Sequence, residues 1–223
     1  MRDLPIIFNA DMVRAVLDGR KTQTRRIIQS PAKNMQARGH ECISYRAPGD
    51  QWYQDYVFSM RDRSGVWQDY KHEQFLAKCP FGAAGDRLWV REAFRVMGRA
   101  TDVARLMYKA RERNSFTEST RTVPINKCNK QSSYNWTPSI HMPRWASRIT
   151  LEITGVRVER LQDISDSDAK SEGCWYGRGG GEPDFAVNPS DHFPTLWASI
   201  YGEESWQANP WVWVIEFKRV EVK

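Results

Sequence analysis

The stretch Gly19-Arg-Lys-Thr-Gln-Thr-Arg-Arg-Ile27 carries four cations and two hydroxyls in nine residues. It follows four apolar residues at helical spacing, which are Met12, Val13, Val16 and Leu17. Their period predicts a helix capped by Asn9 or Asp11, and Gly19 stands where a left-handed residue ends a helix. The basic stretch therefore leaves a helix C-terminus, where cations meet the negative end of the helix dipole.

Length and charge set the outer limits of the interpretation. The chain has 223 residues and a mass of 26.0 kDa, enough for one domain with insertions or for two small domains. A net charge of +6 favours polyanionic partners such as RNA or DNA, and it is equally compatible with a basic protein that binds neither. Ten tryptophans can stack on bases, but filling a core is their commoner use.

The cysteines and the hydropathy point away from metal sites and membranes. The four cysteines, Cys42, Cys79, Cys128 and Cys174, are far apart and form no CxxC pair, so we expect no metal site and no cofactor. The first residues do not resemble a secretory signal, and no apolar run approaches the ~20 residues that span a bilayer. We therefore expect a cytoplasmic protein with reduced thiols.

Glu92 lies in an unusual place for a carboxylate. Residues 88–94 alternate like a strand, and the apolar side chains on one face are Leu88, Val90, Phe94 and Val96. Glu92 falls on that same face, where a carboxylate must be paired, hydrogen-bonded or functional. A buried ion pair with an arginine such as Arg26 or Arg91 is favoured over direct catalysis.

The C-terminal third has the most regular pattern. Ile149, Leu151 and Ile153 alternate as a strand, and the change of phase after Gly155 predicts a β-bulge that bends it. A short helix is predicted from its N-cap Ser165 to a stop at Gly173, and a second helix around residues 193–201. Residues 211–217 are apolar on both faces at first, which is typical of a central strand.

Two polar stretches interrupt these elements. We expect residues 29–80 to form an insertion with little regular structure, and residues 98–143 to form a flexible arm or lid, favoured over a folded subdomain. The glycines of residues 177–181 predict a flexible turn and not a phosphate-binding loop, because the P-loop ending is missing. The predicted class is α+β, mainly β, with one domain over residues 1–223 whose strands bend into a small open or closed barrel with helices at its mouth.

The motif Gly19-x-Lys21-x-x-Thr24-x-Arg26 resembles the GxKxx[ET]xR signature of the ASCH superfamily, whose members have a PUA-like barrel. Residues 85–90, 149–172, 197–201 and 214–218 resemble the strands and helices that follow it in that family. The layout is similar to that of the small ASCH amidohydrolases that remove the acetyl group from N4-acetylcytidine, and to longer ASCH proteins of bacterial prophages. The likeness covers about residues 4–28, 80–97 and 145–220, and it implies a PUA-like ASCH β-barrel with flanking helices and two polar insertions.

The resemblance also implies catalytic residues. The small amidohydrolases use a lysine and a threonine of the signature and a glutamate at the end of the short helix, which correspond here to Lys21, Thr24 and Glu172. A threonine hydroxyl attacks an amide only when a base takes its proton, and lysine is such a base when burial and nearby cations lower its pKa. Glu172 would then pass a proton to the leaving amine, and Arg26 would position a phosphate, carbonyl or carboxylate.

This chemistry requires a bend in the chain. In a flat strand Lys21 and Thr24 face opposite sides, so we predict a turn through residues 20–24 that brings them together. We expect substrate to contact Arg26, Glu92, Arg91, Trp89 and Trp175.

Three functions remain in competition. The first is a hydrolase acting on a modified nucleoside or nucleobase such as N4-acylcytidine. The alternative is a non-catalytic RNA- or DNA-binding module, and the third is a ribonuclease. A nucleoside or RNA is the expected partner, and no membrane partner is expected. Salt separates the first two, because counterion release weakens polyanion binding steeply.

Overall fold

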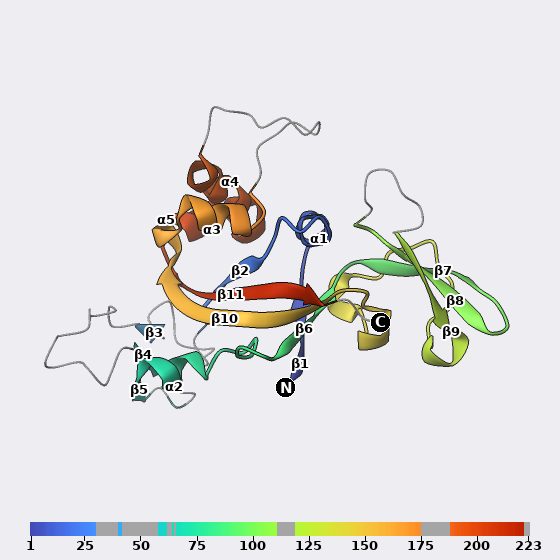
Figure 1. Ribbon diagram of the computed structural model, residues 1–223, viewed down its shortest axis with the longest axis horizontal. Helices are drawn as coiled ribbons and strands as arrows, with labels where there is room; N and C mark the ends of the chain where they lie inside the picture. The colour runs from blue at the N-terminus through green and yellow to red at the C-terminus, as the bar shows by residue number, and fades with distance from the viewer. Residues whose placement is uncertain are drawn as a thin grey trace, which may run out of the picture.

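The computed structural model describes residues 1–29, 40–41, 58–61, 64, 66–110, 119–174 and 188–220. Its largest sheet has five strands in the order β1-β6-β10-β11-β2 (Figure 1). They are β1 (Asp3–Ile7), β6 (Arg87–Arg91), β10 (Thr150–Arg160), β11 (Trp211–Val220) and β2 (Gln23–Ile27). β1 and β6 are parallel and the other pairs are antiparallel. The described residues thus form a mixed α+β structure with more strand than helix, in which β1 and β2 are the two ends of an open sheet.

The two long strands β10 and β11 are the centre of this sheet. β11 pairs with β10 on one side and with β2 on the other, and its first five residues are buried, so the predicted central strand is confirmed. The register of β10 shifts between Ile153 and Gly155, which confirms the predicted bulge. A Cβ at Gly155 would lie 2.8 Å from Oε2 of Glu216 on the paired strand, so glycine permits this close approach.

The sheet is strongly curled. In a flat sheet, four strand-to-strand steps of about 4.8 Å would separate β1 from β2 by roughly 19 Å. Arg26 on β2 nevertheless donates a hydrogen bond from Nη2 to the carbonyl oxygen of Ile7 on β1, at 2.7 Å. Its Cζ also lies 5.6 Å from the centre of the Phe8 ring, which follows β1. The side chain of Arg26 therefore spans the gap between the two edge strands.

Helix α1 (Ala10–Leu17) connects the two edge strands, as predicted from its apolar period. The side chain of Asn9 caps it by accepting a hydrogen bond from the main-chain N–H of Met12, at 2.8 Å. At the other end Gly19 has φ 73°, and Arg20 N–H donates to the carbonyl of Ala15. This pair of features is a Schellman ending, and it turns the basic stretch towards β2.

The helices of the C-terminal third cover one face of the sheet. They are α3 (Asp166–Ser171), α4 (Pro189–Tyr201), α5 (Glu203–Gln207) and the 3-10 helix η4 (Leu161–Asp163). Phe193 and Trp197 of α4 are buried against Val212 and Val214 of β11. α1 and Phe8 pack in a separate apolar cluster. This cluster contains Trp213 and Ile215, whose side chains point to the other face of β11. The sheet is therefore buried on both faces along β11.

A folded subdomain occupies most of the region that we expected to be an arm or lid, so that expectation is wrong. It contains β7 (Phe94–Arg99), β8 (Val103–Tyr108) and β9 (Thr120–Pro124), followed by η1 (Ile125–Lys127), η2 (Ser139–His141) and η3 (Arg144–Ala146). It lies at one end of the molecule (Figure 1) and has its own apolar cluster, in which Phe94, Leu106 and Tyr108 are fully buried. The alternation of Ala104, Leu106 and Tyr108 is the local signal for β8.

The first polar stretch also contains more regular structure than expected. Its described residues include a three-stranded sheet of β3 (His40–Glu41), β4 (Phe58–Arg61) and β5 (Trp67–Tyr70), followed by helix α2 (His72–Leu76). Phe75 of α2 is fully buried and stacks on Trp213, with ring centres 5.1 Å apart. This contact ties the end of the insertion to the main core. None of the helices described is long and apolar enough to cross a bilayer.

Candidate active site

Two helix C-termini meet beside the edge strand β2. Lys21 lies in the turn that ends α1, and its N–H donates to the carbonyl of Ala15 at 2.9 Å. Glu172 is the C-cap of α3, and it is followed by Gly173 with φ 94°. A Cβ at Gly173 would lie 3.0 Å from Cβ of Ala15, so glycine allows the two ends to touch. Thr22 N–H donates to the carbonyl of Ser171 at 2.8 Å and locks the contact.

Lys21 and Glu172 form a buried ion pair at this meeting point. Nζ of Lys21 lies 2.6 Å from Oε2 of Glu172 and 2.9 Å from its carbonyl oxygen, and the two side chains are only 1% and 5% exposed. Burial lowers the pKa of Lys21, since it penalises the charged amine. Glu172 opposes this shift, and the positive charge of Arg26 adds to it. The structure thus brings together two of the three predicted catalytic residues.

Thr24 and Arg26 lie on the face of β2 that packs against Phe8. In the register of β2 and β11, Thr24 is opposite Ile215 and Arg26 is opposite Trp213. Oγ1 of Thr24 is buried and has no hydrogen-bond partner among the described residues. Nζ of Lys21 lies 5.8 Å from the centre of the Phe8 ring that Arg26 also approaches. Arg26 further donates from Nη1 to the hydroxyl of Tyr201, at 3.2 Å.

The predicted bend through residues 20–24 is partly realised. β2 begins at Gln23, so Lys21 belongs to the turn after α1 and not to the strand. The alternation that would point Lys21 away from Thr24 therefore does not apply to this pair. The approach of the Lys21 amine to the Thr24 hydroxyl stays a prediction.

Arg25 was not predicted as a site residue, yet it is the most connected side chain of the cluster. Its side chain is 0% exposed, and Nη1 lies 3.3 Å from Oε1 of Glu172. Nη2 lies 2.9 Å from Oε2 of Glu159 and 3.2 Å from Oδ2 of Asp168. Arg157 in turn pairs with Glu159 and Asp168. Arg25 thus joins β2, β10 and α3 through three carboxylates.

Cys174 is a second residue of the cluster that the sequence did not single out. It is free and 2% exposed, and it follows the Glu172–Gly173 turn directly. Burial raises the pKa of its thiol to about 12, and the nearby charge of Glu172 adds to that shift. The thiol is therefore protonated at neutral pH, and it packs as a small apolar side chain in the cluster that contains Phe193 and Trp197.

Glu92 is buried in an ion pair, but its partner is neither Arg26 nor Arg91. Arg148 donates to both of its oxygens, from Nε at 2.8 Å and from Nη2 at 3.0 Å. Nη2 of Arg148 also donates to the carbonyl of Ala110. Burial raises the pKa of Glu92, and the Arg148 guanidinium opposes this shift. The pair lies where the main sheet passes into the subdomain, since β6 ends at Arg91 before Glu92.

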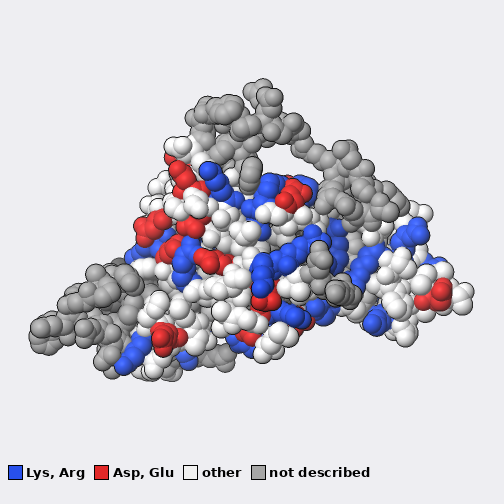
Figure 2. All heavy atoms as spheres, viewed as in Figure 1, with Lys and Arg blue, Asp and Glu red and all other residues white. Residues whose placement is uncertain are grey.

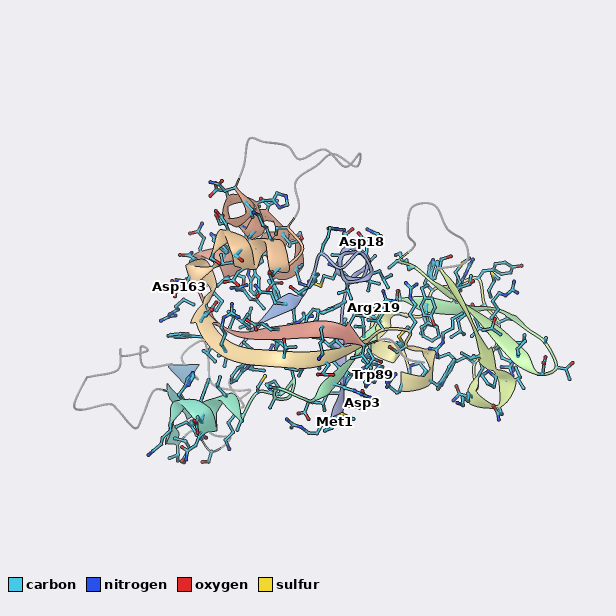
Figure 3. The ribbon with its side chains drawn as sticks, viewed as in Figure 1. Met1, Asp3, Asp18, Trp89, Asp163 and Arg219 are labelled. Atoms are coloured by element: carbon cyan, nitrogen blue, oxygen red, sulfur yellow. The ribbon has the colours of Figure 1, made fainter. Side chains whose placement is uncertain are left out.

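Trp89 and Arg91 form a separate cluster. The guanidinium of Arg91 lies 5.5 Å from the Trp89 ring, and that of Arg144 lies 5.9 Å from the same ring. Arg144 also donates to Asp3 at 2.7 Å. Figure 3 shows Trp89 near Asp3 and apart from Asp18, which marks the end of α1 and the approach to Lys21. Trp175, the last predicted contact, lies outside the described residues, as do residues 177–181.

Many arginines of the subdomain donate to main-chain carbonyls. Arg95 donates to the carbonyl of Tyr134, Arg99 to those of Cys128 and Lys130, and Arg121 to that of Ser147. These contacts hold the irregular segment between β9 and β10. Figure 2 shows lysine and arginine side chains gathered across the middle of the visible face, but part of the basic charge has this internal use.

Within the described part of the chain, no group of three or more His, Cys, Asp or Glu side chains is arranged to hold a metal ion. Comparisons with protein-family models, with curated proteins and with solved structures give no match to this chain. The functional interpretation therefore rests on the geometry around Lys21 and Glu172.

Proposed function

We propose that the protein is an amidohydrolase that removes the acyl group from an N4-acylated cytosine nucleoside. Thr24 is the nucleophile, Lys21 is the base that takes its proton, and Glu172 carries a proton to the leaving nitrogen. The observation that carries the proposal is the buried ion pair of Lys21 with Glu172, two residues 151 positions apart in the chain. Most lysines are exposed to solvent, so the burial of Lys21 against a carboxylate at a helix end indicates a specific role for this side chain.

The ion pair supplies the proton chemistry. A lysine takes a proton only as a neutral amine, and burial favours that form of Lys21. At 2.6 Å Oε2 of Glu172 lies within reach of the proton on Lys21, and in the proposed mechanism its transfer to this oxygen leaves the neutral amine. The low exposure of both side chains keeps water from competing for this proton.

The reaction then runs through an acyl-threonine. Oγ1 of Thr24 bonds to the amide carbonyl carbon while Lys21 takes the hydroxyl proton. The bond from carbon to N4 breaks, and Glu172 gives its proton to N4, which releases cytidine. The proton on Lys21 returns to Glu172, and the neutral amine then takes a proton from water as the water attacks the acyl-threonine. The ester bond breaks, Lys21 gives the proton to Oγ1 of Thr24 and is neutral again, and the products are a carboxylic acid and cytidine.

The hydrogen bonding of the Thr24 hydroxyl supports its proposed role as the nucleophile. Buried hydroxyls are normally hydrogen-bonded, because burial without a partner costs about 1–3 kcal/mol. Oγ1 of Thr24 has no hydrogen-bond partner among the described residues, although Thr24 as a whole is only 1% exposed. Arg26 lies on the same face of β2, and in this proposal it binds the carbonyl oxygen of the substrate.

We further propose that the main sheet is the barrel of a PUA-like ASCH domain. The hydrogen bond from Arg26 to Ile7 supports this, because it requires the sheet to curl until its two edge strands approach each other. The bulge at Gly155 and the helix between β1 and β2 agree with the same architecture.

A non-catalytic RNA-binding module is the second candidate. The band of basic side chains in Figure 2 favours it. A polyanion binder weakens steeply as salt rises, whereas hydrolysis of a nucleoside hardly changes. The internal use of Arg95, Arg99 and Arg121 reduces the charge that is left for phosphates.

The test is direct. The purified protein is incubated with N4-acetylcytidine and with longer N4-acyl cytidines, and released cytidine is quantified by chromatography. We expect release by the wild type, a loss of at least a hundredfold in Lys21→Ala, and wild-type rates in Lys170→Ala, whose lysine is exposed on α3. No turnover of any acylated cytidine by the wild type would reject the hydrolase and favour the binding module.

A further inference from the structure

We infer that Arg25 is a positioning residue of this site, which holds Glu172 so that one carboxylate oxygen always faces Lys21. The inference rests on the proposed function for its catalytic consequence. Arg25 is not one of the signature positions Gly19, Lys21, Thr24 and Arg26, so the motif alone does not assign it a role.

The two oxygens of Glu172 have different partners. Oε2 accepts from Nζ of Lys21 at 2.6 Å, and Oε1 faces Nη1 of Arg25 at 3.3 Å. A carboxylate with both oxygens engaged on opposite sides cannot rotate about its last bond without breaking one contact. Arg25 therefore fixes the plane of the carboxylate, and with it the direction in which Lys21 finds its proton partner.

Arg25 is itself held rigidly, which a positioning residue requires. Its Nη2 bridges Glu159 and Asp168, and Arg157 ties those two carboxylates together from the other side. The ring of Phe193 lies 5.9 Å from its Cζ. The guanidinium is planar and branched, so a lysine at this position would reach Glu172 or the other two carboxylates, but not all three.

Loss of the contact between Arg25 and Glu172 should lower the pKa of Lys21. The neighbouring charges with the largest effect on the amine are those of Glu172 and Arg26. Glu172 is the group that raises the pKa of Lys21 against the effect of burial. A Glu172 that swings away leaves burial and Arg26 unopposed, so the pKa of Lys21 falls further.

The experiment compares Arg25→Lys with Asp168→Asn, which keeps the contact between Arg25 and Glu172. The titration of Lys21 is followed through its 13Cε resonance by NMR, without any substrate. We expect the midpoint to move to lower pH in Arg25→Lys and to stay at the wild-type value in Asp168→Asn. With acetylcytidine we expect a tenfold or larger loss of kcat in Arg25→Lys, with KM little changed.

The outcomes separate the inference from the proposed function. An unchanged Lys21 titration in folded Arg25→Lys overturns the positioning role. A shifted titration in a protein that hydrolyses no acylated cytidine supports the positioning role and rejects the proposed function. If Arg25→Lys does not fold, the double variant Glu159→Gln/Asp168→Asn releases Nη2 while Arg25 stays; a midpoint moved to lower pH supports the inference, and an unmoved one overturns it.

Discussion

Thr24 and Arg25 are neighbours in β2 and are both buried, yet the hydroxyl of Thr24 has no described partner while the guanidinium of Arg25 faces three carboxylates. Successive side chains of a strand point to opposite faces, so one edge strand presents two environments. One face supplies a free hydroxyl next to Phe8, and the other binds the strand to α3 and β10. The same five residues of β2 thus carry both the proposed chemistry and its support.

Replacement of Thr24 by valine should stabilise the protein while it abolishes hydrolysis. Valine has nearly the same shape and removes a buried hydroxyl without a described partner, so the free energy of unfolding should rise by about 1 kcal/mol. Urea denaturation measures this change, and Thr24→Ser, which keeps the nucleophile, should retain part of the turnover. A Thr24→Val variant less stable than the wild type would mean that the hydroxyl is hydrogen-bonded.

Gly173 should be the least replaceable glycine of the site. An alanine with positive φ costs about 1–2 kcal/mol, and at Gly173 its Cβ would also lie 3.0 Å from Cβ of Ala15. Gly19 is the matched control, because it ends α1 in the same way with nothing within 4 Å of its Cβ position. Thermal denaturation should show a larger loss in Gly173→Ala than in Gly19→Ala. Equal losses would show that the two helix ends are not in contact.

The elements that follow from local rules are predictable from the sequence. Asn9 and Ser165 cap their helices, and Gly19 and Gly173 end them, because a cap or a left-handed residue acts within one turn. The bulge at Gly155 follows from the change of phase in the apolar pattern. Lys21 and Glu172 were reached through the resemblance, and not through any local pattern.

The features missed by sequence reasoning depend on long-range contacts. Arg25 is one of several arginines in a basic stretch. Its place in the site depends on ion pairs with Glu159 and Asp168, which are more than 130 residues away in the sequence. The partner of Glu92 is Arg148, 56 residues later, and no periodicity distinguishes it from Arg91. The subdomain was obscured by polar and charged residues that lie between the buried positions of its strands.

Replacement of Glu92 by glutamine should destabilise the protein without affecting chemistry. It removes one charge of a pair whose side chains are 2% and 12% exposed, and breaking such a buried pair costs about 3 kcal/mol. Asp3→Asn is the control, because the Asp3–Arg144 pair is 45% exposed on both sides and should contribute under about 1 kcal/mol. Turnover per folded molecule should match the wild type in both variants. A specific loss of kcat in Glu92→Gln would instead place Glu92 in the reaction.

Asp86 should contribute to acid stability. Hydrogen bonds from the main-chain N–H groups of Arg2 and Ala83 lower its pKa from 3.8 to about 2 in the folded protein. A carboxyl with a lowered folded pKa stabilises the protein above its unfolded pKa, and this stability is lost as the pH falls from about 4 to about 2. Asp86→Asn should therefore be less stable than the wild type at pH 5, and the difference should shrink steadily as the pH falls to about 2. Denaturation at several pH values tests this, and a difference independent of pH would contradict it.

The pH dependence of deacylation should depend on the charge of Arg26. The reaction needs the one proton that Lys21 and Glu172 hold between them, so the rate should fall as the pH rises through the pKa of Lys21, which burial places below 10.5. Arg26 lowers that pKa further, so Arg26→Gln should move this falling limb of kcat to higher pH. Arg20→Gln is the control, because Arg20 pairs with Asp18 and its side chain is 31% exposed, so solvent screens its charge. A limb that moves equally in both variants, or in neither, would show that Lys21 is not the base, since Arg26 is the cation with the largest effect on its amine.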